Sequence, residues 1–176
     1  MIKKNKLALF LLFFISLIIS GSIDGFALYA QNPDKAVALV NFLKLASRIL
    51  KYAFYIGLIP VVINGFKYLS AWKNHKNQSE TQLGTNNNLD SLLQLNSSKI
   101  KFQNILYIDV CLKFLSSCLS EALGFIFGGS FFVSIIPVIV FGASVYIWAT
   151  KDGTKASGIL ILYLLYKIAR LTILRM

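Results

Sequence analysis

The stretch ALGFIFGGSFFVSIIPVIVFGASVYIWAT, residues 122–150, decides the class of fold because it contains no charged residue. An uncharged apolar run of this length is typical of a helix that crosses a membrane. Tyr146 and Trp148 near its end are the aromatic residues expected where such a helix meets water. The stretch therefore predicts a membrane span.

Glycines within this stretch allow two interpretations. Gly124 and Gly128 have the four-residue spacing that lets two membrane helices approach closely. The segment Gly128-Gly129-Ser130 fits a turn equally well. We favour the turn slightly, because Gly129 and Ser130 weaken a helix.

Composition extends the membrane prediction to the whole chain. The 176 residues are 56% hydrophobic and 14% charged, with a mean hydropathy of +0.66, whereas soluble domains average about 45–50% apolar and 25% charged residues. We predict an all-α helical membrane protein with three to four transmembrane or membrane-associated helices. The net charge of +11 comes from basic residues scattered at membrane edges, which favours anionic lipid head groups over nucleic acid as the partner.

The N-terminus has the pattern of a signal peptide over residues 1–27. A lysine-rich head precedes an apolar run over Leu7–Ile19, which is shorter than the roughly twenty residues that a spanning helix needs. Small residues then end at Ala27, the preferred cleavage site, with Ala30 as the second choice. The alternative is an uncleaved anchor that extends to Ile23.

A second span is expected over residues 49–72. The basic residues Lys44, Arg48 and Lys51 share one helical face just before it, and the run from Tyr52 to Phe66 is uncharged. Pro60 removes a backbone donor and predicts a kink in this span. The side chain of Asn64 has two options: it bonds back to the carbonyls that Pro60 frees, or across to another helix.

The polar segment 73–101 is predicted to be a cytoplasmic loop. Its centre, TNNNLD, has no apolar periodicity, and lysines lie at both of its ends. His75 has no cysteine or second histidine at ligand spacing, and Glu80 and Asp90 are isolated, so we expect no metal site. The loss of hydrophobicity at its start is then a membrane edge.

A family resemblance rests on the residues around this edge. The motif residues are Trp72-Lys73-Asn74-His75-Lys76, Thr81-Gln82, Leu83-Gly84-Thr85 and, further on, Phe127-Gly128-Gly129. In this order they resemble the IcmD (DotP) family, over residues 28–130. The resemblance implies a small multi-pass subunit of the bacterial inner membrane that assembles with other subunits of a Dot/Icm type IVB secretion apparatus. The lack of a proline after Asn77 and Gln78, and the whole of residues 131–176, depart from the family pattern.

Residues 102–126 form a helix that is either spanning or interfacial. Asp109 and Lys113 lie four residues apart on its polar face, in the order that favours an ion pair, with Glu121 at the edge of that face. We prefer a span in which Asp109 and Lys113 pair toward a protein partner. Cys111 and Cys118 lie on the apolar face, too far apart for a disulfide within one helix, and are expected to be buried thiols.

The remaining chain, residues 131–176, is predicted to be a membrane hairpin with a turn at KDGTK, residues 151–155. No catalytic constellation is recognisable in the sequence, so we expect no enzyme, cofactor or metal. The first hypothesis is a structural secretion-system subunit in a homo- or hetero-oligomer. The alternative is a small channel, holin-like or transporter-accessory protein, with Asp109, Lys113 and Glu121 lining an aqueous path.

Overall fold

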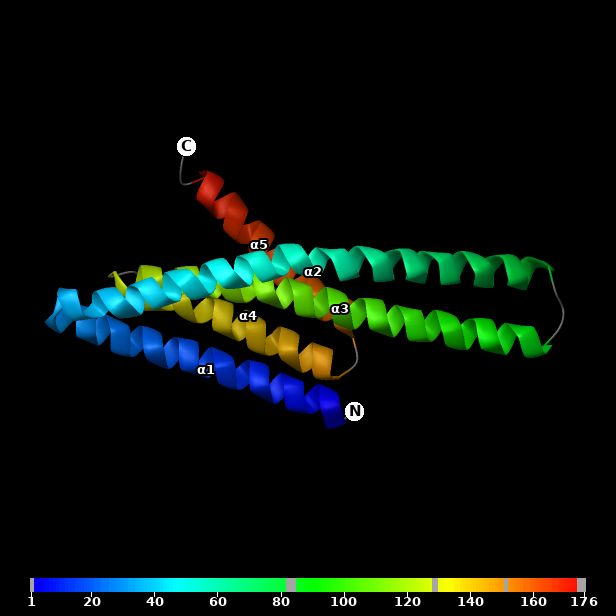
Figure 1. Cartoon of the computed structure of the whole chain (residues 1–176), viewed down its shortest axis with the longest axis horizontal. Helices are drawn as coiled ribbons and strands as arrows, with labels where there is room; N and C mark the ends of the chain where they lie inside the picture. The colour runs from blue at the N-terminus through cyan, green and yellow to red at the C-terminus, as the bar shows by residue number, and fades with distance from the viewer. Residues whose placement is uncertain (1, 82–84, 128–129, 151, 174–176) are drawn as a thin grey trace.

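The computed structural model describes residues 2–81, 85–127, 130–150 and 152–173, and within them the chain is helical with no strand. The all-α prediction is therefore confirmed for this part of the chain. Figure 1 shows the arrangement of the helices, which are α1 (Ile2–Gln31), α2 (Pro33–Thr81), α3 (Thr85–Ile126), α4 (Phe131–Ala149) and α5 (Gly153–Ile173).

Helix α3 lies at the centre of the bundle and contacts all four other helices. Tyr107, Phe114 and Ile126 on it are completely buried. The Phe114 ring stacks on Phe141 of α4 with 5.7 Å between centroids, and Tyr107 stacks on Trp148 at 4.8 Å. Such aromatic pairs stabilise a core beyond the area that they bury. The second half of α3 is therefore largely enclosed by the other helices of the chain.

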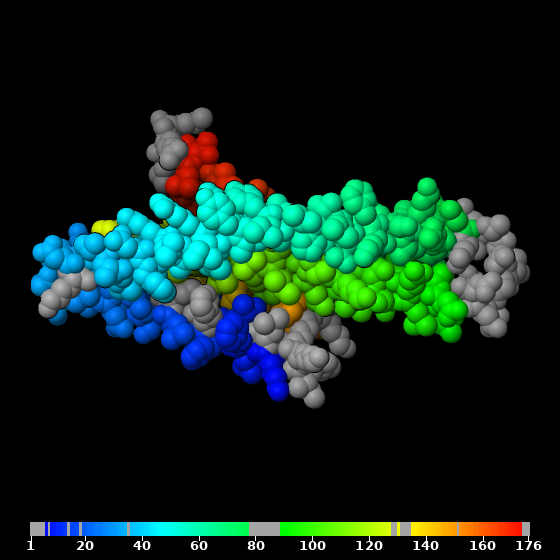
Figure 2. Space-filling view, viewed as in Figure 1, coloured from blue at the N-terminus to red at the C-terminus, as the bar shows by residue number. Residues whose placement is uncertain are grey.

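The predicted loop over residues 73–101 is wrong for the described residues. Helix α2 continues to Thr81 and α3 begins at Thr85, so the two form a long antiparallel hairpin that projects beyond the other helices (Figures 1 and 2). Partly buried side chains on α3 recur at spacings of four and three, at Ser91, Leu95, Ser98 and Phe102. Two of these are serines, so the face that pairs with α2 has no visible apolar periodicity.

Three helices are long and apolar enough to cross a membrane: Ala8–Gln31, Ala36–Asn77 and Gly153–Ile173. This is consistent with the predicted membrane protein. The apolar part of α1 is longer than the run of Leu7–Ile19, and the helix continues through the expected cleavage sites at Ala27 and Ala30.

The stretch 122–150 is two helices, so the prediction of one continuous span across it is wrong. Helix α3 ends at Ile126 and α4 begins at Phe131, directly after Ser130. The chain thus leaves the helix where the turn interpretation places it, although Gly128 and Gly129 themselves lie outside the described residues. Among the described residues, no atom beyond the surrounding backbone of α3 lies within 4 Å of a Cβ added to Gly124, so this glycine makes no close contact with another described helix.

Helices α4 and α5 form the expected C-terminal hairpin. Asp152 precedes α5 and accepts a hydrogen bond of 3.3 Å from the backbone N–H of Lys155, which lowers the pKa of the Asp152 carboxyl. At Gly153, α5 passes so close to the backbone of Gln103 that a Cβ there would stand 3.1 Å from its carbonyl oxygen. The C-terminal end of α5 projects from the bundle at an angle (Figure 1).

Candidate functional site

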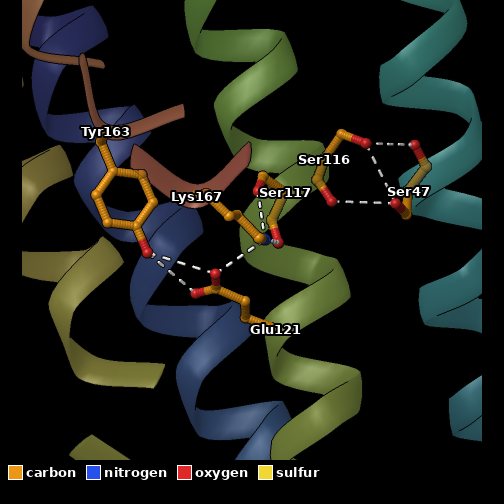
Figure 3. A network of polar contacts seen from close by, with 6 residues as sticks. All are labelled: Ser47, Ser116, Ser117, Glu121, Tyr163 and Lys167. Carbon is orange, nitrogen blue, oxygen red and sulfur yellow. Dashed lines mark hydrogen bonds and ion pairs between the residues drawn. The ribbon is translucent and has the colours of Figure 1, made fainter. Parts of the chain in front are cut away.

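Two serines join α2 to α3 at the middle of the bundle. The Ser47 hydroxyl donates to the backbone carbonyl of Ser116 at 3.1 Å, and the Ser116 hydroxyl donates to the carbonyl of Ser47 at 3.0 Å. Figure 3 shows this reciprocal pair. Small hydroxyl residues let helices approach closely and satisfy their own polar groups in doing so. The pair therefore fixes the register between α2 and α3.

A polar network on the opposite side of α3 joins it to α5 (Figure 3). The Lys167 ammonium lies 2.8 Å from a carboxylate oxygen of Glu121 and donates to the Ser117 hydroxyl at 2.7 Å. The Tyr163 hydroxyl lies 3.4 Å from both carboxylate oxygens. The side chains of Glu121 and Lys167 are only 15% and 23% exposed. The ion pair is therefore shielded from water, and each charge depends on the other for compensation.

Asp109 faces α2 rather than α5. Its residue exposure is 3%, and neither carboxyl oxygen has a hydrogen-bond partner in the part of the chain that the structure describes. The opposing residue on α2 is Gly57, where an added Cβ would collide with the Asp109 carboxyl. The missing side chain at Gly57 is thus what makes room for the acid.

The predicted Asp109–Lys113 ion pair is not formed. The carboxyl turns inward to Gly57, whereas the Lys113 ammonium lies 5.8 Å from the centroid of the Phe54 ring. A long lysine side chain reaches toward the surface more readily than it folds back into the contact between two helices. The structure also separates the three residues of the channel hypothesis, because Asp109 faces Gly57, Lys113 the Phe54 ring and Glu121 helix α5.

The first part of the motif that carries the family resemblance, Trp72 to Lys76, lies on helix α2 and not at the start of a loop. Trp72 and Lys73 are exposed, and Lys76 is exposed about one and a half turns before the end of the helix. His75 is half-buried and its Nδ1 lies 3.0 Å from the Ser91 hydroxyl of α3, at hydrogen-bond distance. Thr81 ends the helix, while Gln82 and Gly84 lie outside the described residues.

An apolar cavity of about 220 Å³ lies between α1, α3 and α4. Ile15, Ser22, Cys118 and Ile135 are among the residues that line it. Cys118 is half-buried and Cys111 is buried, and both thiols are free, as expected. Among the residues that the structure describes, no group of three histidine, cysteine or acidic side chains lies close enough to hold a metal ion.

Sequence reasoning missed most of the partners in these contacts. Ser47 lies among basic residues of α2, which suggested contact with lipid head groups. Gly57 lies in an apolar run, which suggested contact with lipid tails and not with a buried acid. Tyr163 and Lys167 are four residues apart and share a face of α5. Lys167 on this face, together with Glu121 among the apolar residues of 102–126, was a sequence signal for an ion pair between two helices.

No protein-family model matches the chain, and no curated protein or solved structure matches it either.

Proposed function

We propose that this protein is a structural subunit of a bacterial inner-membrane assembly, and specifically an IcmD-like component of a type IVB secretion apparatus. One observation carries the structural role. The polar side chains inside the bundle, at Ser47, Ser116, Glu121 and Lys167, bond to neighbouring helices of the same chain. Polar contacts of this kind hold helices in fixed positions.

The specific assignment has further support in the α2–α3 hairpin. It presents the exposed Trp72, Lys73 and Lys76 on one helix, in the order of the family motif. An aromatic residue beside two basic residues is suited to a boundary with anionic lipid, or to acidic partners close to it. The other subunits of the apparatus are the partners proposed for this surface.

This assignment is tested by purifying the tagged protein from a host that carries a type IVB secretion system. We expect the protein in the inner-membrane fraction, with other subunits of the apparatus in the same detergent-solubilised complex. The double change Lys73→Glu and Lys76→Glu should reduce the recovered partners several-fold without releasing the protein from the membrane. Lys99→Glu with Lys101→Glu is the matched control, because it makes the same charge change on the exposed surface of α3. Recovery of the protein in the soluble fraction, or alone from the membrane, would contradict the proposal.

Retention of α1 is a second part of the proposal, and it adopts the uncleaved-anchor alternative. Ala8, Ile15 and Ser22 recur every seven residues and are buried in the bundle, and Gly25 packs against Leu39 and Ile126. Cleavage after Ala27 or Ala30 would remove all of these contacts and expose the core. N-terminal sequencing and the intact mass of the membrane-purified protein should therefore show a start at Met1. A start at Leu28 or Gln31 would establish the signal peptide instead.

A further inference from the structure

The Asp109 carboxyl occupies an environment that disfavours its ionised form. It is 3% exposed, and both oxygens lack a hydrogen-bond partner among the described residues. A carboxylate without water, hydrogen bonds or a counter-ion costs far more free energy in an apolar interior than a neutral carboxyl does. Burial of this kind is therefore compatible with the protonated acid.

Among the side chains that the structure describes on α2, α3, α4 and α5, none supplies Asp109 with a compensating positive charge. Helix α2 is uncharged from Tyr52 to Phe66, and α4 carries no charged residue. Lys113, one turn further along α3, lies over the Phe54 ring instead. On α5, Lys167 is paired with Glu121, three turns away along α3.

We propose that Asp109 is a proton-binding site, and that the bound proton keeps α2 and α3 in contact at Gly57. Gly57 allows α2 to lie directly on the carboxyl, with no side chain between them. When the proton leaves, the carboxylate needs water, and water reaches it only if α2 moves away from α3 at this point. The site thus couples proton release to the opening of the hairpin.

Pro60 provides a place where α2 can make this movement. Pro60 lies within the helix about one turn after Gly57. It has no backbone N–H to donate to the carbonyl one turn earlier, so one hydrogen bond of the helix is missing there. The Asn64 amide donates to the Pro60 carbonyl at 2.8 Å, so it bonds back within α2 and not across to another helix. The proposal concerns the α2–α3 contact alone and does not depend on the secretion-system assignment.

Infrared spectroscopy of the full-length protein in lipid nanodiscs tests the protonation step. At a mildly acidic pH where exposed aspartates are already ionised, we expect the carbonyl band of a protonated carboxyl, which disappears in Asp109→Asn and is lost from the wild type as the pH is raised further. Asp90→Asn is the matched control, since Asp90 is an exposed acid on the same helix, and it should leave the band unchanged. Absence of the band at that mildly acidic pH, or its persistence in Asp109→Asn, would overturn the proposal.

The opening step is tested by the distance between spin labels attached at positions 56 and 108. Ile56 on α2 and Ile108 on α3 are exposed, and replacement of Cys111 and Cys118 with Ala leaves only the two introduced thiols. The distance should lengthen over the same pH range in which the infrared band is lost, and should stay constant when Asp109→Asn is added. An unchanged distance while the band disappears, or equal lengthening with Asp109→Asn, would overturn the coupling. The infrared measurement needs no thiol replacement and remains decisive if this background folds poorly.

Discussion

Replacing Lys167 with Met is expected to lower the free energy of unfolding by about 3 kcal/mol, because it leaves a shielded Glu121 carboxylate without its counter-ion. The Tyr163 hydroxyl remains beside that carboxylate at 3.4 Å, but one neutral donor does not replace a positive charge. The measurement is the unfolding of the protein in detergent micelles, followed by circular dichroism during titration with a denaturing detergent.

Two further variants separate loss of the ion pair from loss of packing. Adding Glu121→Gln to Lys167→Met should restore most of the stability, because a neutral amide needs no counter-ion. Lys155→Met is the control for removing a lysine, since its ion pair with Asp152 is exposed, with side-chain exposures of 78% and 41%. It should leave the unfolding midpoint unchanged. If Lys155→Met destabilised the protein as much as Lys167→Met, shielding of the Glu121–Lys167 ion pair from water would not explain the loss of stability.

Gly57→Leu should destabilise the fold by a similar amount, about 3 kcal/mol, because the new side chain would occupy the space of the Asp109 carboxyl. The two helices would have to separate or shift their register, and the Ser47–Ser116 hydrogen bonds lie along the same contact. The same denaturation assay measures the loss.

Gly124→Leu is the matched control, because Gly124 is a helical glycine with open space around the added Cβ. It should leave stability unchanged or raise it slightly, since glycine is a poor helix former. A rescue test identifies the cause. Gly57→Ala should be destabilising alone but tolerated together with Asp109→Ala, which removes the colliding carboxyl. Equal losses in both backgrounds would show that Gly57 is needed for another reason.

The sequence predicts the class of fold well because composition and uninterrupted apolar runs are properties of the whole chain. It predicts the hairpin of residues 73–101 poorly because the stability of that segment comes from pairing. Ser91 and Ser98 face α2 without contributing an apolar pattern, and an isolated helix with such a face would have little reason to form. In residues 122–150 the uniform hydrophobicity suggests a single span, but the weak helix formers Gly129 and Ser130 indicate the turn, and α3 does end at Ile126.

In the candidate site, too, the local sequence identifies single residues, whereas the contacts between them depend on the tertiary fold. Asp109, Lys113 and Glu121 stand out in the sequence because charges are rare among apolar residues. Their partners do not, because Gly57, Phe54 and Lys167 come from helices whose relative positions only the fold determines. A four-residue spacing suggested that Asp109 and Lys113 pair, yet Asp109 is buried against Gly57 and Lys113 lies over the Phe54 ring.

The length of α2 has a consequence for where partners meet this protein. Its 49 residues extend over about 73 Å at 1.5 Å per residue, whereas the hydrocarbon core of a bilayer is only about 30 Å thick. Even at a tilt of about 40°, near the upper limit for membrane helices, a helix of this length extends roughly 56 Å along the membrane normal. In the proposed membrane arrangement, about 26 Å of its height therefore stands outside the hydrocarbon. A soluble protein can bind that part of α2 without contacting the lipid tails.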